Sequence, residues 1–534
     1  MCQSAYTSLD RQIPSIISYV DGEEYVGNEA KAQLVRNKDN TVAYFRDFIG
    51  QEFASIDPTH CHASAHPKQV DNTIAFTIQD KEEGEPSTVT VEETTTRLLK
   101  RLISSASDFT GKIVDSAVIA IPTNFTDKQK AALRESAKNA GVEVLQLIAE
   151  PVAALLAYDG RPDAVITDKT VVVADFGGTR SDISIVASRG GIYTILATSH
   201  DYDFAGCHLD QVLMDHFAKE FIKWNTTDPR VDARPYAKLK AEAEACKKAL
   251  SIGTNSAFAI ESLAEGADFS STINRLRFET IGRKVFDGFN RLVESTIKKA
   301  GLDVLDIDQV ILTGGTSHIP KIANNFRGIF PETTEILAPS TSATAINPSE
   351  LAARGAALQA SLIELYDSED IQQATHPAAT TLKHLANSIG VLAITSDESR
   401  GVFTEIIKAD TAAPVRRVMN CKAPKAGGDV LVKVVEGGSH IKVTKPEPKP
   451  KSNGAKVADA DSDDSEEDSD EDEEEIRERV YKVGNVIAEL AVKGVPAGAE
   501  IEVTIQVNAD LSTVISAREA GKSATTKAEI PKPN

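Results

Sequence analysis

The chain has 534 residues, enough for about two to four domains with sizeable cores. Hydrophobic residues make up 41% of it and charged residues 26%, which is ordinary for a soluble protein. The net charge is −21, but residues 459–475 contain 13 acids and no base, so the remaining chain carries only −8. A mildly acidic body gives no electrostatic basis for extensive direct nucleic-acid binding.

The cysteines and the hydropathy pattern indicate where the protein resides. The start, MCQSAYTSLDRQ, has no basic segment followed by an apolar one, and no apolar run approaches the roughly 20 residues that span a bilayer. The cysteines are odd in number, far apart and without C-x-x-C spacing, which favours a reducing compartment. We therefore expect a soluble, cytoplasmic protein. The cysteines are Cys2, Cys61, Cys207, Cys246 and Cys421.

Four ligand-type side chains crowd into one short polar segment: His60, Cys61, His62 and His66. Such a set could suggest a metal site, but no second ligand cluster elsewhere completes a tetrahedral shell. A surface loop is therefore the preferred interpretation of this segment.

Residues 117–158 carry a regular strand and helix pattern. AVIAIP predicts a buried strand, and Thr126 with Gln129 three residues later predicts a capped helix that stops at Gly141. VLQLIA predicts another strand, and Pro151 stands at the favoured first position of a second helix. This alternation indicates an α/β layered domain.

The stretch VVVADFGGTRSDISIV, residues 171–186, predicts two strands joined by a turn at Gly177 and Gly178. Glycines there let backbone N–H groups approach a phosphate closely. Asp175 and Asp182 flank the turn, where carboxylates could hold the water shell of a Mg²⁺ ion. An isolated turn of this kind is more often an ordinary hairpin with a solvated rim, so the phosphate interpretation needs a partner motif.

That partner is a second glycine pair, Gly314 and Gly315, where QVILTGGTSHIPKI passes from a strand to a helix. Backbone N–H groups converge there on a potential anion site. Residues 346–364 predict an amphipathic helix that closes the unit. Two apolar strands that each end in a glycine pair, about 140 residues apart, indicate a duplicated architecture with a nucleotide cleft between its halves.

Residues 208–252 are predicted to be helical, and a helix is predicted near 277–300. Within the first segment, four polar side chains recur at steps of three and four residues and therefore share one helix face. Surface salt-bridging is the simplest explanation of such a face taken alone. These residues are Glu244, Lys247, Lys248 and Ser251.

Four ordered blocks resemble the signature sequences of DnaK-type heat-shock chaperones, which share a superfamily with actin and hexokinase: DFGGTRSD, IAEPVAALLAY, ILTGGTSHIPKI and INPSELAARGAALQA. The similarity runs from about Asp10 to Leu365 and resumes more weakly from about residue 381. It implies an α/β fold, with an actin-like, duplicated ATPase-type nucleotide-binding domain followed by a small β-sandwich domain. The implied domains are residues 1–365 and 383–534, joined by a polar linker at 366–382.

The resemblance implies ATP as the bound ligand, with Mg²⁺ possible, held by Asp175 through water. It assigns phosphate contacts to the two glycine turns and adenosine contacts to one helix face and to His318, which stands where an arginine normally stacks on the base. The implied cofactor-binding residues are Gly177, Gly178, Thr179, Glu244, Lys247, Lys248, Ser251, Gly314, Gly315 and His318.

Two departures from the family pattern bear on catalysis. Arg46 stands where active members carry the lysine that steers the attacking water, and Arg180 replaces the threonine beside the γ-phosphate. Glu150, Asp175 and Asp182 are retained. Because phosphoryl transfer depends on fine positioning, we expect ATP binding to survive where hydrolysis does not, and no catalytic residue is assigned. The family's N-terminal phosphate-loop strands have no counterpart here, which we expect to reflect an incorrect or alternative start.

The C-terminal part differs from the family as well. Short alternating strands predict an antiparallel sandwich without the helical lid: IGVLAIT, GVFTEII, DVLVKVV, VIAELAV and IEVTIQV. An acidic insertion over about 446–477 is expected to be disordered. The linker is polar, with Ile371 almost its only apolar residue, so coupling between nucleotide and peptide sites is doubtful.

Together these departures resemble the atypical, ribosome-associated branch of the family in fungi. That resemblance implies a co-chaperone that binds ATP, pairs stably with a zuotin-like J-domain protein on the ribosome, and stimulates a second, active heat-shock chaperone on nascent chains. One alternative is an active ATP-hydrolysing chaperone that binds and releases unfolded clients itself. Another is a kinase of the same superfamily for a small sugar-like substrate, which the β-rich tail disfavours.

Overall fold

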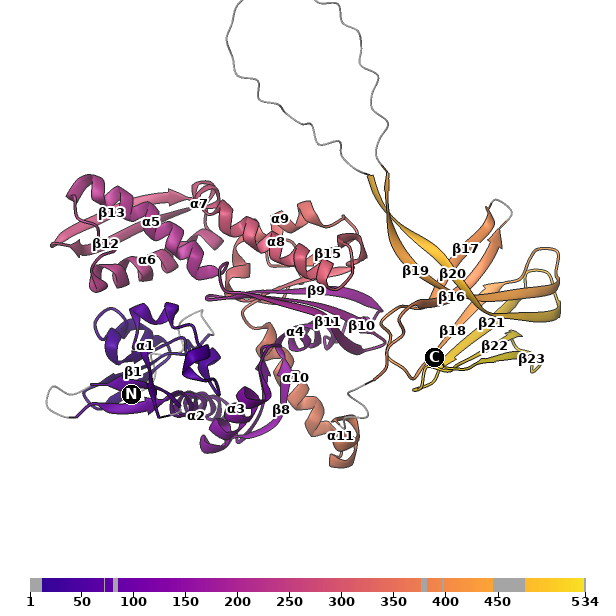
Figure 1. The fold of residues 1–534 in the computed structure, drawn as a ribbon, viewed down its shortest axis with the longest axis horizontal. Coiled ribbons are helices and arrows are strands. Elements are labelled where there is room, and N and C mark those ends of the chain that lie inside the picture. Colours follow the sequence, from indigo (N-terminus) through magenta and orange to yellow (C-terminus); the bar gives the residue numbers. More distant parts are fainter. Residues whose placement is uncertain are drawn as a thin grey trace, which may run out of the picture. The chain divides into compact units, whose positions relative to one another are not determined.

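A computed structural model describes residues 12–71, 73–79, 85–375, 382–395, 398–444 and 476–532. The chain divides into two compact units, Met1–Thr375 and His376–Asn534 (Figure 1). No helix in the described ranges is long and apolar enough to cross a membrane. The four cysteines within those ranges are free thiols.

A five-stranded sheet forms the centre of the first unit, in the order β11-β10-β9-β14-β15. The hairpin predicted at 171–186 is confirmed, with Asp182 opposite Asp175 in antiparallel pairing. β14 runs parallel to β9 and places Thr313 opposite Asp175, so both glycine turns leave the same edge of the sheet. The strands are β9 (Lys169–Phe176), β10 (Ser181–Arg189), β11 (Ile192–Asp201), β14 (Gln309–Thr313) and β15 (Glu335–Leu337).

Apolar side chains on one face of this sheet pack beneath helices, with Phe176, Phe217 and Phe289 fully buried among them. The helix predicted near 277–300 is interrupted at Gly282, which separates two helices. The elements of this half are α5 (Gly206–Asn225), α6 (Ala233–Ile252), β12 (Asn255–Ala264), β13 (Ala267–Asn274), α7 (Arg275–Ile281), α8 (Arg283–Lys299) and α9 (Pro320–Ile329).

Side chains of α4 (Glu150–Asp159) and the start of α10 (Leu351–Leu365) pack with strand residues such as Val173 and Ile311 in a second core cluster. The expected helix at 346–364 therefore begins five residues later, because residues 346–350 form a loop and turn. Pro151 opens α4 as predicted.

The remaining part of the first unit contains small sheets and two capped helices. The capping box of Thr126 and Gln129 is present at the start of α3, as predicted. Cys61 is fully buried in the core, so the expectation of a surface loop is wrong for its side chain. The elements are β1 (Ile17–Val20), β2 (Glu23–Val26), α1 (Asn28–Gln33), β3 (Thr41–Val42), β4 (Pro67–Val70), β5 (Thr73–Ile78), β6 (Ser87–Thr90), α2 (Val91–Thr110), β7 (Ser116–Ile121), α3 (Asp127–Asn139) and β8 (Glu143–Ala149).

The second unit contains only strands among its described residues from 382 to 532, arranged in the sheets β17-β16-β19-β20 and β18-β21-β22-β23. Val434, Val503 and Ile505 are fully buried in a core that both sheets contribute to. The strands are β16 (Ser388–Thr395), β17 (Glu398–Ile407), β18 (Val415–Lys422), β19 (Gly428–Thr444), β20 (Ile476–Val495), β21 (Glu500–Val507), β22 (Thr513–Glu519) and β23 (Thr525–Ile530).

The predicted polar linker and the predicted acidic insertion are described only in part. The polar linker is helical at its start, where α11 spans Ser368–Thr375, a helix that the sequence reasoning did not foresee. Residues 376–381 and nearly all of the acidic insertion, residues 445–475, lie outside the described residues.

Candidate functional site

The two glycine turns predicted from the sequence come together in the first unit. Gly177 N donates to the carbonyl of Arg180 at 3.0 Å, closing the hairpin turn that also contains Gly178 and Thr179. The Thr316 hydroxyl donates to the carbonyl oxygen of Gly177 at 2.8 Å, which ties the second turn to the first. Gly206 N donates to the same oxygen at 3.0 Å, so the start of α5 joins them.

Gly314 shows why the close contact between the second turn and the end of β9 requires a glycine. Its φ is +84°, and a Cβ there would lie 2.2 Å from the Asp175 Oδ1 atom. Any larger residue would collide with that carboxylate, and it would also be destabilised by the left-handed backbone conformation. Gly315 follows and begins a short 3-10 turn, Gly315–His318, rather than the α-helix expected directly after the glycine pair.

Arg180 lies at the centre of a polar cluster and is only 3% exposed. Its Nε donates to Asp182 Oδ2 at 2.7 Å, and its Nη1 donates to the Tyr202 hydroxyl at 3.1 Å and lies 3.5 Å from Asp47 Oδ2. Asp182 also contacts His200 Nδ1 through its other oxygen. The guanidinium is thus fixed by three neighbours at the mouth of the hairpin turn.

Arg46 approaches the same cluster from the N-terminal part of the unit. Its Nε lies 2.9 Å from Asp47 Oδ1, and its Nη1 lies 3.9 Å from Glu150 Oε1. Burial works to lower the pKa of Arg46, but Asp47 and Glu150 outweigh it and raise that pKa. Both residues that depart from the family pattern therefore pair with carboxylates of the cleft.

A small cavity lies among the retained carboxylates Glu150, Asp175 and Asp182 and has a volume of about 10 Å³. That is room for no more than one water molecule. Burial, followed by the neighbouring charges of Glu150 and Asp182, raises the pKa of Asp175 to about 7. Burial also raises the pKa of Glu150.

The four-residue face of α6 divides into surface and buried parts. Glu244 Oε1 lies 2.5 Å from Lys31 Nζ on α1 and 3.2 Å from Lys248 Nζ. Burial opposes ionisation, but Lys31 and then Lys248 lower the pKa of Glu244 to about 2. Salt-bridging therefore accounts for two of the four side chains.

Lys247 instead points into the protein. Its ammonium lies 2.8 Å from the carboxylate of Asp210 and donates to the carbonyl of Gly206 at 2.9 Å. The Ser251 hydroxyl donates to the Lys247 carbonyl at 3.0 Å, so it caps its own helix backbone. His318 Nε2 lies 3.1 Å from both Asn347 Oδ1 and Ser349 Oγ.

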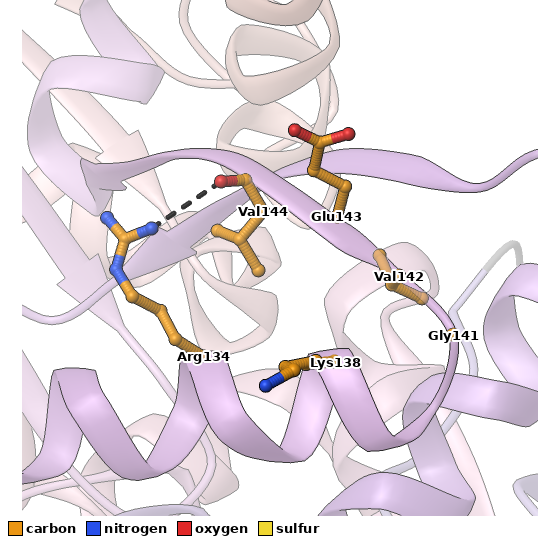
Figure 2. A pocket seen from close by; sticks show the side chains of 6 residues that line it. All are labelled: Arg134, Lys138, Gly141, Val142, Glu143 and Val144. Atoms are coloured by element: carbon orange, nitrogen blue, oxygen red, sulfur yellow. Dashed lines mark hydrogen bonds between the residues drawn. The ribbon is translucent and has the colours of Figure 1, made fainter.

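A larger cavity, about 390 Å³, lies between α3 and β8 (Figure 2), and no residue of the glycine turns lines it. Arg134 and Lys138 line it from α3, and Arg134 donates to the Val144 carbonyl at 3.4 Å. None of the site residues predicted from the sequence lines this cavity. The small cavity is the one that the retained carboxylates Glu150, Asp175 and Asp182 line.

Sequence reasoning did not single out several residues of the cluster: Asp47, Tyr202, His200 and Thr123 around Arg180 and Asp182, and Lys31 and Asp210 beside α6. They belong to no motif, and they reach the site from several segments, with only His200 and Tyr202 sharing one, at the end of β11. The one available signal was the adjacency of Asp47 to Arg46 in the sequence.

The combination of this α/β unit with a β-sandwich defines an Hsp70 fold, and the family model for Hsp70 protein matches residues 6–444. The chain therefore belongs to the Hsp70 family, which confirms the resemblance drawn from its four sequence blocks. Membership of this family implies nucleotide binding and marks the protein as a divergent Hsp70-type chaperone.

Three relatives within the Hsp70 family are similar to this chain over most of its length. The chain is 42% identical to the ribosome-associated complex subunit SSZ1 of Saccharomyces cerevisiae, over 98% of this chain and 94% of that protein. It is also 42% identical to a heat shock protein 70 homologue of Schizosaccharomyces pombe, over 95% of this chain and 88% of that protein. Heat shock 70 kDa protein 14 of Danio rerio is 32% identical over 80% of this chain and 82% of its own length.

Proposed function

We propose that the protein binds ATP at the joined glycine turns with little or no hydrolysis. The observation that carries this proposal is the fixed position of Arg180, which is held by Asp182, Asp47 and Tyr202. A buried guanidinium beside the turn can bind phosphate, but it offers no mobile base or hydroxyl to orient an attacking water.

The nucleotide contacts proposed here are those of the sequence analysis, with one difference of role. The hairpin turn and the Gly314–Gly315 turn bind the phosphates, while Glu244, Lys248, Ser251 and His318 line the adenosine side. Lys247 supports this wall from behind, because its ammonium is already occupied by Asp210 and Gly206.

We further propose that residues 1–365 act as the nucleotide-binding domain, and that 366–382 link it to a substrate-binding-type sandwich at 383–534. Long β19 and β20 pair over most of their length in this sandwich, and exposed apolar residues such as Val486 and Leu431 lie on them. Strand edges and apolar side chains of this kind suit a standing protein partner that adds a strand.

The relative from Saccharomyces cerevisiae is a subunit of a ribosome-associated complex. In our proposal this protein likewise acts at the ribosome in the cytoplasm, and its partner is the zuotin-like J-domain protein that the family resemblance implies. In this proposal the complex stimulates a second, active heat-shock chaperone on nascent chains. A pull-down from cell extract should recover ribosomes and a J-domain protein in stoichiometric amounts, and their absence would contradict this part of the proposal.

The hydrolysis proposal is tested by mixing excess full-length protein with radiolabelled ATP in a single-turnover assay. We expect nucleotide to bind while the γ-phosphate stays attached, whereas an active Hsp70 assayed in parallel releases phosphate. Rapid cleavage by the isolated protein would instead support the second candidate, an ATP-hydrolysing chaperone. That candidate is favoured by one observation, the clustering of Glu150, Asp175 and Asp182 around one water-sized cavity.

A further inference from the structure

The carboxylates of the cleft do not fit a magnesium ion. Both oxygens of Asp182 are already engaged, one by Arg180 and the other by His200. Glu150 faces Arg46 at 3.9 Å. Only Asp175 has no ion-pair or hydrogen-bond partner in the part of the chain that the structure describes.

The size of the cavity among the carboxylates also argues against a magnesium ion. Mg²⁺ requires near-octahedral coordination and keeps several of its waters when it binds to proteins. The cavity among Glu150, Asp175 and Asp182 measures about 10 Å³, which admits at most one water molecule. A hydrated cation is larger than this space.

Arg180 itself has an unused donor. Its Nη2 atom is buried and has no hydrogen-bond partner among the described residues, although the side chain is only 3% exposed. A buried donor without an acceptor is costly, and the cost is greater for a charged group. An anionic oxygen beside the hairpin turn would remove this cost.

The backbone around Arg180 fits the same kind of ligand. The N–H groups of Gly178 and Thr179 make no hydrogen bond within the described chain, and no side chain would crowd a ligand at Gly178, where even an added Cβ meets nothing within 4 Å. Free N–H groups beside a guanidinium form a strong donor set for phosphate oxygens.

We propose that this cleft binds the triphosphate of a nucleotide without a divalent cation, with the Arg180 guanidinium in the place and the charge role of the metal. The inference rests on the proposed nucleotide binding and specifies its chemistry. Arg46 assists by neutralising Asp47 and Glu150, which would otherwise repel the phosphates. The ligand is thus free ATP rather than its magnesium complex.

The test compares ATP binding by full-length protein in magnesium and in EDTA, using calorimetry or displacement of a fluorescent ATP analogue. We expect the dissociation constants in the two buffers to agree within about threefold. Binding that appears only with magnesium would overturn the inference while leaving the proposed nucleotide binding intact. No binding in either buffer would contradict the proposed function itself.

Substitutions of Arg180 test whether this residue is responsible for ATP binding without a metal. In EDTA, Arg180→Thr should weaken ATP binding by about tenfold to a hundredfold, because a charge-assisted contact is lost. Magnesium should restore much of that loss, and Mn²⁺ bound together with ATP should become detectable by electron paramagnetic resonance only in this variant. Arg134→Thr, an exposed arginine beside the outer cavity, is the matched control and should bind as the wild type does.

Arg180→Lys is the second variant, to be used if Arg180→Thr proves unstable, because it keeps the positive charge. It should retain metal-independent binding more closely than Arg180→Thr does, since charge is the property at issue. If Arg180→Lys and Arg180→Thr bind ATP in EDTA as tightly as the wild type, Arg180 has no such role. The wild-type comparison of the two buffers requires no variant and decides whether ATP binding needs a divalent cation, while the variants decide whether Arg180 takes the role of that cation.

Discussion

Individual side chains in the cleft are governed by how charges are paired when water is removed. Arg180 and Lys247 are both buried cations, and each is held by a carboxylate at hydrogen-bonding distance. Lys31 and Glu244 form a more exposed pair that connects α1 to α6. A buried ion that loses its partner is far more destabilising than an exposed one. Substitutions at these positions should therefore lower the free energy of unfolding by amounts that differ several-fold.

Lys247→Met tests the buried pair. Removal of the ammonium leaves the Asp210 carboxylate buried without compensation, so we expect a loss of about 3–5 kcal/mol in the free energy of unfolding. Lys248→Met, on the exposed side of the same helix, should change it by about 1 kcal/mol or less. Urea unfolding at pH 7 measures both, and equal losses would contradict the structural role of Lys247.

The Lys31–Glu244 pair predicts a pH dependence. The pKa of Glu244 is about 2 in the folded protein and near its ordinary, higher value in the unfolded chain. The stabilisation is therefore complete above the unfolded pKa and is lost as the pH falls toward the folded pKa.

Glu244→Gln removes this contribution, which we expect to be about 1 kcal/mol because the pair is partly exposed. The variant should be less stable than the wild type at pH 7, and the difference should shrink as the pH is lowered below about 4.5. Urea unfolding between pH 3 and 7 measures it. A difference that grows on acidification would contradict the assignment.

At the scale of elements, close backbone approach decides where helices can lie. α10 passes directly over α4, and a Cβ added at Gly355 would lie within 1.8 Å of the Ala153 carbonyl oxygen. That distance is far below van der Waals contact with rigid backbone, so the two helices would have to separate. Gly355 is thus a packing requirement rather than a flexible point in α10.

Gly355→Ala should lower the free energy of unfolding by about 2–4 kcal/mol through this clash. Gly328→Ala in α9 is the matched control, because a Cβ there meets nothing within 4 Å. The control should be neutral or raise stability by up to about 1 kcal/mol, since alanine favours helix. Thermal unfolding of both variants decides, and equal stabilities would exclude the clash.

At the scale of the whole molecule, the chain consists of two units, one α/β and one β. The proposed linker between them, 366–382, is mostly polar, and the large apolar side chains among its described residues, 366–375 and 382, are Tyr366, Ile371 and Leu382. Apolar side chains are what would dock such a segment onto a neighbouring surface and transmit a change of state. We therefore expect nucleotide binding to act on the first unit alone.

Scanning calorimetry with and without ATP tests this independence. ATP at about 100 times its dissociation constant should stabilise the first unit by about 2.7 kcal/mol and raise the temperature of its transition. The transition of the β unit should remain where it is. A shift of both transitions together would show that the units are coupled despite the polar linker.

Local patterns were sufficient to predict much of the fold. The hairpin at 171–186, the capping box of Thr126 and the start of α4 at Pro151 depend on residues close in sequence, and all are present. The helix at 346–364 and the one near 277–300 were misplaced in part, because a loop and Gly282 interrupt patterns that continue in hydropathy. α11 was missed since its sequence is polar on nearly every side.

The sequence by itself determined the family, the alternation of strands and helices, and the glycine pairs, because each depends on local spacing that folding preserves. Only the tertiary structure decided which charges meet. It brought Asp47, Tyr202 and His200 to Arg180 and Asp182, and it turned Lys247 inward to Asp210. Such pairs join distant segments, and their partners are selected by the free energy of burying charge, which has no periodicity along the chain.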